Sequence, residues 1–143
     1  NQIEKYRQRI SGPLLDRIDL HVDVPAVNYK ELRSDSVGES SEVIRERVEE
    51  ARQIQLERFV SHPGVNSNAD MTSRLVAQFC ELDRHSEMTL EQAMENLNFS
   101  ARAHDRILKV SRTLADLEGS KDIKEVHVME AIQYRTLDRN LWA

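Results

Sequence analysis

Residues 18–24 alternate apolar and polar side chains, and no other segment of the chain does so over a comparable length. This period of two predicts a short β-strand with one buried face. Pro25 would end the strand, because proline cannot donate a hydrogen bond to a sheet. A strand requires neighbouring strands, and the rest of the sequence offers none. We therefore expect a mostly helical protein in which one short β-strand and turn form the end of another domain.

The turn precedes the strand at Gly12-Pro13, where proline is tolerated because the first residues of a turn or helix need no N–H donor. This turn would place Arg17 at the entrance of the strand. An arginine fixed there can act on an anion. The simpler interpretation of the pattern alone is a salt bridge from Arg17 to Asp16, to Asp19 or to a neighbouring helix.

Helix signals begin after a linker rich in serine and aspartate at residues 34–38, and we place a domain boundary at residues 37/38. Ser40 or Ser41 can cap the first helix, which His62-Pro63-Gly64 would end. Apolar spacing predicts that its inner face consists of Ile44, Val48, Ala51, Gln55 and Phe59. A second helix is expected from Asp70 or Thr72, and a third after a break at residues 83–86.

The strongest helix pattern covers Ala101 to Leu117, with Ser100 as its cap and Gly119 just past its end. Its predicted buried stripe is Ala103, Ile107, Val110, Leu114 and Leu117. A last helix is expected from about Glu125 to Arg135, although Lys124 is a poor cap. Together these patterns predict a bundle of four or five helices over residues 38–143.

The net charge of −5 argues against a surface that coats nucleic acid in general. The charge is unevenly placed, however. Residues 1–17 carry a net charge of +2 and residues 100–113 a net charge of +3, the latter from Arg102, Arg106, Lys109 and Arg112 against Asp105. Two local basic patches on an acidic chain indicate a localised anionic partner.

The second patch lies at the start of the strongest helix, where backbone N–H groups already attract anions. Arg102, Arg106 and Lys109 would share one side of this helix, turned away from its apolar stripe. A guanidinium at a positive helix end suits a phosphate group. An exposed basic face that answers acidic helices of the same bundle is an equally good interpretation of the pattern.

The sequence offers no other catalytic or metal-binding pattern. The five histidines lack HxxH and HExxH spacing, no CxxC occurs, and there is no P-loop, so we expect no metal site in this chain. The single cysteine, Cys80, lies in an apolar helical pattern and is expected to be a buried hydrophobic residue. No apolar run approaches the length of a membrane span and no signal peptide is evident, which suits a cytoplasmic protein.

Two stretches of the sequence are distinctive. The first is YRQRISGPLLDRIDLHVDVP at residues 6–25. The second is the FSARA segment at residues 99–103, continued by RTLADL at 112–117 and EAIQYR at 130–135. Both resemble the magnesium-chelatase-like AAA+ ATPases of the YifB/ComM group. The resemblance implies residues 1–37 as the end of the AAA+ α/β core and residues 38–143 as its helical C-terminal lid.

The resemblance also implies roles for three arginines. Arg17 matches the arginine finger and Arg102 the sensor-2 arginine, and Arg102 and Arg106 would contact ATP phosphates of a neighbouring subunit. The implied assembly is a hexamer-like ring of identical subunits that uses ATP and Mg²⁺ to remodel DNA during recombination or natural transformation. The P-loop and Walker B motifs would lie before Asn1. We therefore expect this chain alone to bind no nucleotide and to be inactive.

Two alternatives remain open at the level of sequence. The same motor could drive metal insertion into a porphyrin, as chelatase subunits do, although the SGPLLDRID motif at residues 11–19 favours the DNA-remodelling motor. A helical adaptor without any role in ATP hydrolysis is the alternative from another class. The unpartnered strand and the acidic balance count against it.

Overall fold

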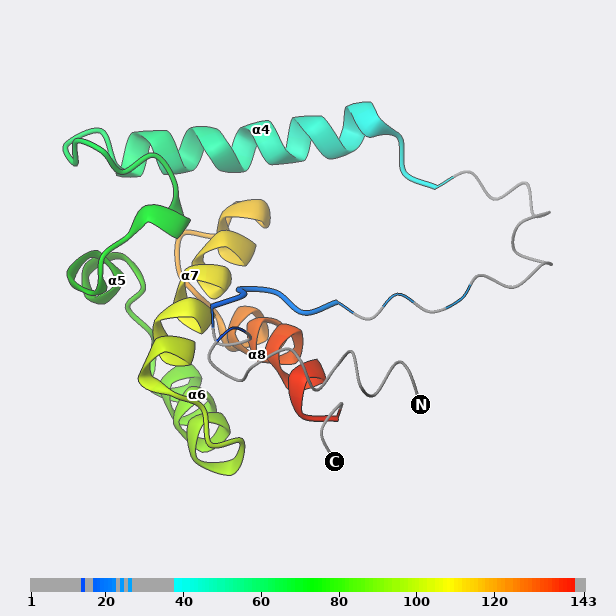
Figure 1. Ribbon diagram of the computed structural model, residues 1–143. Coiled ribbons are helices and arrows are strands. Elements are labelled where there is room, and N and C mark those ends of the chain that lie inside the picture. Colours follow the sequence, from blue (N-terminus) through cyan, green and yellow to red (C-terminus); the bar gives the residue numbers. More distant parts are fainter. Residues whose placement is uncertain (1–13, 15–16, 23, 25, 27–37, 141–143) are drawn as a thin grey trace.

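The computed structural model describes residues 14, 17–22, 24, 26 and 38–140, and it confirms a mostly helical fold (Figure 1). Within these residues the chain forms five α-helices and one 3₁₀ helix, and the predicted bundle of four or five helices is right. The elements in chain order are α4 (Ser41–Arg58), η1 (Asn68–Asp70), α5 (Ser73–Phe79), α6 (Arg84–Asn96), α7 (Ala101–Leu117) and α8 (Glu125–Asn140).

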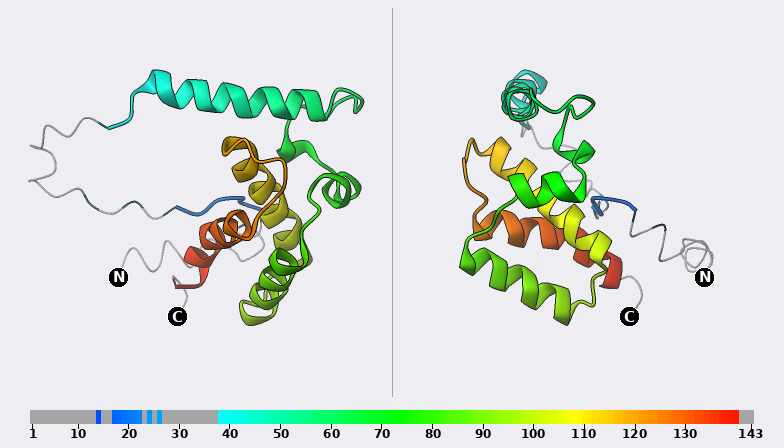
Figure 2. Two further views of the ribbon diagram at one scale, coloured as in Figure 1. Left: turned by 180° about the vertical axis from the view of Figure 1, so that it is seen from behind. Right: turned by 90° about the vertical axis from the view of Figure 1, so that its left-hand side faces the viewer.

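Helix α7 is the centre of the arrangement. It contacts α8, α4, α5 and η1, while α6 packs against α8, and all three views show α7 surrounded by the other helices (Figures 1 and 2). Burying an aliphatic or aromatic side chain of this core contributes roughly 1.5–3 kcal/mol relative to leaving it exposed. The core consists of Phe59, Met71, Leu75, Val76, Cys80, Leu90, Ile107, Leu108, Ala115, Ile123, Val128, Ala131 and Ile132.

The ends of α7 follow the sequence signals closely. The Ser100 hydroxyl accepts a hydrogen bond from the Ala103 N–H at 3.2 Å, as expected of an N-cap. At the other end Gly119 has φ +69°, its N–H donates to Asp116 O, and the Ser120 N–H donates to Ala115 O at 2.8 Å. These two bonds form a Schellman motif, which requires a left-handed residue and so favours glycine.

Helix α8 begins at Glu125 as predicted, but its start is stabilised by a residue that the sequence analysis overlooked. The Lys124 N–H donates to Nδ1 of His127 at 3.0 Å. Because Nδ1 accepts this bond, the ring proton lies on Nε2, which contacts Oε2 of Glu118. The buried imidazole therefore caps α8 and ties it to the end of α7.

The predicted inner face of α4 is only half right. Ala51, Gln55 and Phe59 are buried, but Ile44 and Val48 remain 42% and 45% exposed. The first half of α4 extends beyond the other helices (Figures 1 and 2), so its apolar side chains meet no neighbouring helix there. A periodic stripe identifies a shared face, and it does not say how far along the helix a partner extends.

The predicted stripe of α7 is also shifted. Val110 and Leu114 are half-buried and Leu117 is exposed, while Leu108 and Ser111 are buried beside Ile107 and Ala115. The reason is that α7 is covered from several sides, so its buried surface is wider than a single stripe.

The predicted strand over residues 18–24 is not formed by the described residues of that segment. Its apolar side chains are exposed, with Ile18 at 41% and Val24 at 81%. The described part of the chain provides no strand to pair with it, and its backbone bonds to α8 instead: the His21 N–H donates to Tyr134 O at 2.8 Å. The one β-bridge among the described residues joins Leu82 and Ile123 in parallel.

The turn before this segment is seen only at its end, because Gly12 and Pro13 lie outside the described residues. Leu14 is helical, and the Arg17 N–H donates to Leu14 O at 3.0 Å. None of the helices in the described ranges combines the length and apolar character of a membrane span.

Candidate functional site

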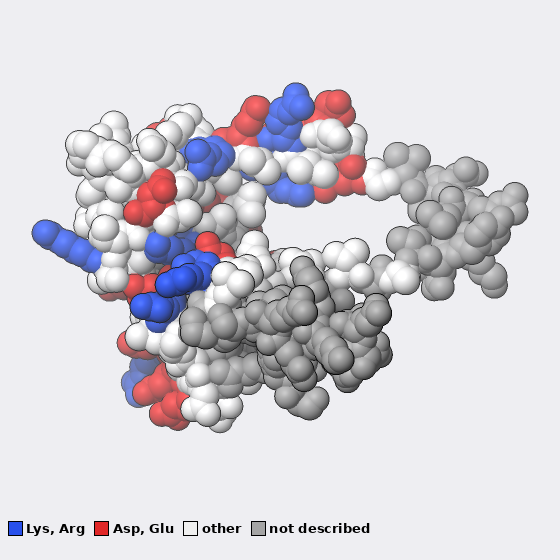
Figure 3. Space-filling view, viewed as in Figure 1, with Lys and Arg blue, Asp and Glu red and all other residues white. Residues whose placement is uncertain are grey.

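The basic face predicted on the strongest helix is present on α7. Arg102, Arg106 and Lys109 line one pocket of about 220 Å³, together with Asp19, Ala69 and Asp105. The space-filling view shows Lys and Arg side chains gathered over the region that α7 occupies in Figure 1, with acidic atoms among them (Figure 3). We call this group of three side chains, Arg102, Arg106 and Lys109, the basic face of α7.

The three side chains differ in how strongly the fold engages them. Lys109 Nζ donates to the carbonyl oxygen of Ala69 at 2.9 Å, and Arg106 forms an ion pair with Asp19. Arg102 is exposed and forms no ion pair with any described residue. Arg102 is therefore the cation of this face that stands open to an anion from outside.

The position of Arg102 adds to this electrostatic character. It lies in the first turn of α7, where the helix dipole is positive and favours negative charge. A second arginine one turn further on, Arg106, makes the same helix end more positive. The macrodipole disfavours arginine at such a position in an isolated helix, so an anionic ligand would relieve an existing repulsion.

One acid of the pocket is already engaged. Asp105 accepts a hydrogen bond from the Ser73 hydroxyl at 2.6 Å and lies 3.2 Å from Nδ1 of His104. Partial burial acts to raise the pKa of Asp105, but the hydrogen bonds from Ser73 and His104 outweigh it and the pKa is lowered. Asp105 therefore stays ionised and is held on the α5 side of the pocket.

Arg17, the second predicted site residue, is exposed and lies two residues before Asp19. Its side chain does not line the pocket that holds Arg102. The structure thus brings the segment of Arg17 to the basic face of α7, and Asp19 is the residue that joins them. It does not place the two guanidiniums in one pocket.

Arg112, which the sequence analysis counted with the basic patch, has a structural role instead. Ten residues along an α-helix place it about 80° around the axis from Arg102. It is buried, its Nε lies 3.1 Å from Oδ1 of Asp116, and its terminal nitrogens donate to the carbonyl oxygens of Ser120 and Lys121. Burial lowers the pKa of Arg112, and the carboxylate of Asp116 opposes this shift only in part.

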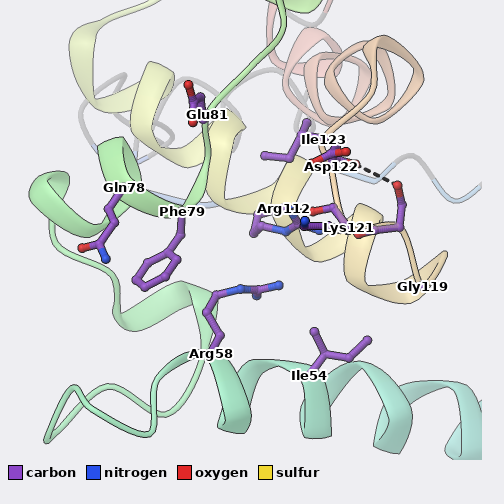
Figure 4. Close-up of a pocket in the computed structure, with 11 residues that line it drawn as sticks. Ile54, Arg58, Gln78, Phe79, Glu81, Arg112, Gly119, Lys121, Asp122 and Ile123 are labelled. Atoms are coloured by element: carbon purple, nitrogen blue, oxygen red, sulfur yellow. Dashed lines mark hydrogen bonds between the residues drawn. The ribbon is translucent and has the colours of Figure 1, made fainter.

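Asp116 also pairs with Arg58 from the end of α4. The close-up shows Arg58 and Arg112 approaching each other from α4 and α7, in a pocket of about 490 Å³ (Figure 4). Asn68 completes the cluster, since its Nδ2 donates to Asp116 at 2.8 Å and its backbone N–H donates to Gln55. Sequence reasoning missed this cluster. The four-residue spacing of Arg112 and Asp116 was its only local signal.

Among the described residues, no group of three His, Cys, Asp or Glu side chains is arranged to hold a metal ion. The arrangement that remains is an anion site, which consists of an exposed guanidinium at a helix start, a second guanidinium paired with the carboxylate of Asp19, and a lysine. Such a set can bind phosphate oxygens and neutralise their charge.

Comparison with known proteins assigns both parts of the chain to one group. Residues 38–135 match the family model described as magnesium chelatase, subunit ChlI C-terminal, and residues 1–32 match the model described as magnesium chelatase, subunit ChlI. The predicted boundary at residues 37/38 stays a prediction, and the two matched ranges lie on either side of it.

Individual relatives cover almost the whole chain. It is 41% identical over 141 residues to the competence protein ComM of Haemophilus influenzae and 40% identical over 141 residues to YifB of Escherichia coli. YifB of Salmonella typhimurium is 37% identical over the same length. Each match covers 98% of this chain but only 27% of the relative, so the chain spans about a quarter of the length of these proteins.

Proposed function

The chain belongs to the magnesium chelatase family of ChlI-type subunits, and on that premise we propose that it is the C-terminal lid of a ring-forming AAA+ ATPase. In this proposal residues 38–143 form the lid and residues 1–37 the end of the ATPase core. The much greater length of the relatives supports it, because their remaining three quarters have room for a nucleotide-binding core.

The observation that carries the proposal is the open guanidinium of Arg102 at the positive start of α7, beside Arg106 and Lys109. These residues fit a polyphosphate: they are cations, they share one face, and Arg102 is exposed. We assign Arg102 as the sensor-2 arginine, with Arg106 as a second contact to the phosphates. Mg²⁺-ATP would supply the phosphoanhydride bond that is cleaved.

Arg17 is assigned as the arginine finger. Its exposed side chain would donate hydrogen bonds to the phosphoryl oxygens of a neighbouring subunit's site, where negative charge is redistributed during transfer. Positioned arginines of this kind accelerate phosphoryl transfer by roughly 10³- to 10⁵-fold. A ring of identical subunits is the assembly that would bring Arg17 to such a site.

For the substrate of the motor we propose DNA, in branch migration or a related remodelling step during recombination or natural transformation. The support is the 41% identity to a competence protein over nearly the whole chain. A motor for metal insertion into a porphyrin is the second candidate, and the description of the matching family favours it.

ATP hydrolysis by the full-length protein tests the proposal and separates the two candidates. We expect turnover that rises when branched DNA is added and that does not respond to a porphyrin with Mg²⁺. Arg102→Ala should remove this turnover, while Arg74→Ala, an exposed arginine on α5, should leave it unchanged. A full-length protein without ATPase activity, with or without DNA, would contradict the proposal. Stimulation by porphyrin in place of DNA would favour the second candidate.

A further inference from the structure

Asp19 and Arg106 form an ion pair between the N-terminal segment and α7. Resting on the proposed function, we propose that these two side chains are positioning residues. Their pair ties Arg17 to the helix that carries Arg102, so that the two arginines move as one unit when the lid moves. Arg106 is itself assigned to the ATP phosphates, whereas Asp19 is not. Asp19 is therefore the residue to test.

The segment after Arg17 is held by polar contacts of Ile18, Asp19 and His21. Arg135 Nη1 donates to the carbonyl oxygen of Ile18 at 2.7 Å, Asp19 pairs with Arg106, and the His21 N–H donates to Tyr134 O at 2.8 Å. Leu20 lines a pocket of about 320 Å³ together with residues of α7 and Tyr134 of α8. Both α7 and α8 thus contribute to the attachment.

This attachment restricts where Arg17 can be. Consecutive Cα atoms lie about 3.8 Å apart, so fixing Ile18 leaves Arg17 within one peptide of the attachment point. The Arg17 N–H also closes a turn onto Leu14 O at 3.0 Å. The side chain itself stays exposed. The backbone is positioned while the guanidinium remains available for an external phosphate.

Of the two carboxylates in the pocket that holds Arg102, Asp19 pairs with Arg106 and Asp105 does not. Asp105 is engaged by Ser73 and His104, so Asp19 is the described carboxylate that pairs with Arg106. The Asp19 and Arg106 side chains are 48% and 29% exposed. An ion pair this exposed adds little to the stability of a fold. Its removal should therefore change the placement of Arg17 and leave the helical bundle intact.

The kinetic test uses Asp19→Asn in the full-length protein. The pair is exposed and restrains Arg17 only modestly, so we expect kcat for ATP hydrolysis to fall by about two- to fivefold with little change in KM. Asp19→Glu should restore most of the rate, because it keeps the charge. Asp122→Asn, at an exposed loop position, is the matched control and should behave as wild type.

The second readout needs no nucleotide. Hydrogen exchange of the His21 amide in the same full-length protein reports the attachment directly, because that N–H bonds to Tyr134 O. We expect Asp19→Asn to accelerate its exchange by about two- to fivefold and to leave amides in the middle of α7 unchanged.

The outcomes separate this inference from the proposed function. An unchanged His21 exchange rate, or a wild-type kcat in an active Asp19→Asn protein, would overturn the positioning role and leave the ATPase assignment standing. Absence of ATPase activity in the wild-type protein would remove both the assignment and the kinetic role of Asp19. Faster exchange together with a lower kcat and rescue by Asp19→Glu would support the inference.

Discussion

Arg58 and Asp116, 58 residues apart in the chain, form a bidentate ion pair that joins the end of α4 to the end of α7. Arg58 Nη1 lies 2.7 Å from Oδ2 of Asp116, whose side chain is completely buried. The same carboxylate accepts hydrogen bonds from Arg112 and Asn68. All its acceptor positions are thus directed at protein donors, and α7 is held in a fixed place beneath α4.

The first prediction concerns this carboxylate. Asp116→Asn should lower the free energy of unfolding by about 3–5 kcal/mol, because it leaves two guanidiniums without their buried counter-charge. Urea unfolding followed by circular dichroism measures the change. Glu91→Gln, at an exposed position of α6, is the matched control and should stay within about 0.5 kcal/mol of wild type. A loss below about 1 kcal/mol in Asp116→Asn would refute the role given to this pair.

The second prediction compares two isoleucines that the sequence pattern treats alike. Ile107 is fully buried and Ile44 is 42% exposed. Ile107→Ala should cost about 2–5 kcal/mol, since it removes core contacts and leaves a cavity, whereas Ile44→Ala should cost about 0.5 kcal/mol or less. The same urea titration measures both. Equal losses would show that the first half of α4 is covered in solution.

The third prediction is a pH dependence set by Glu118. Hydrogen bonds from Lys124 and from His127 lower the pKa of Glu118 below its ordinary value of 4.5. A carboxyl group with a lowered pKa in the folded state stabilises that state above its unfolded pKa, and this contribution is lost as the pH falls through the folded pKa. The unfolding free energy of wild type minus that of Glu118→Gln should therefore shrink as the pH drops below about 4.5. A difference that grows on acidification would contradict the assigned contacts.

The fourth prediction concerns the thiol of Cys80. Burial raises the pKa of Cys80 to about 11, although the nearby guanidiniums of Arg112 and Arg58 act in the opposite direction. The thiolate is the reactive form, so the folded protein should react very slowly with iodoacetamide at neutral pH. The same protein in concentrated urea should react at the rate of an ordinary thiol. Rapid labelling of the folded protein, detected by mass spectrometry, would place Cys80 at the surface.

Much of the helical fold was predictable because its signals are local. Ser100 and Gly119 mark the ends of α7 by their own side-chain and backbone chemistry, and the structure contains both motifs. The start of α8 was also right, but its stabilising residue was not found. His127 reaches back to the Lys124 N–H, and its buried position depends on the packing of α8.

The remaining errors come from contacts between distant parts of the chain. Arg112 was grouped with the basic patch although its partner Asp116 lies only four residues away, because nothing local indicates that Asp116 also pairs with Arg58 of α4. The strand expected at residues 18–24 is not formed by the described residues of that segment, for the same reason. Its alternation shows that one face can be buried, and only a neighbouring strand would make it a sheet.

The basic residues of the candidate site could be predicted from the sequence, but the ion pair that joins the site to the N-terminal segment could not. Arg102 and Arg106 share the basic face that their spacing predicts. That Asp19 would pair with Arg106, and so bring the segment of Arg17 to that face, could not be read from the sequence, because the two residues belong to different predicted domains.

The central claim is that Arg17 and Arg102 act on phosphates of the same ATP-hydrolysing assembly, and a double-mutant cycle in kcat tests it most directly. We expect Arg17→Ala and Arg102→Ala each to lower kcat of the full-length protein by roughly 10³-fold or more. The double variant should be scarcely slower than the slower single variant, because residues that act as a unit are not additive. Wild-type kcat in both single variants would contradict the claim.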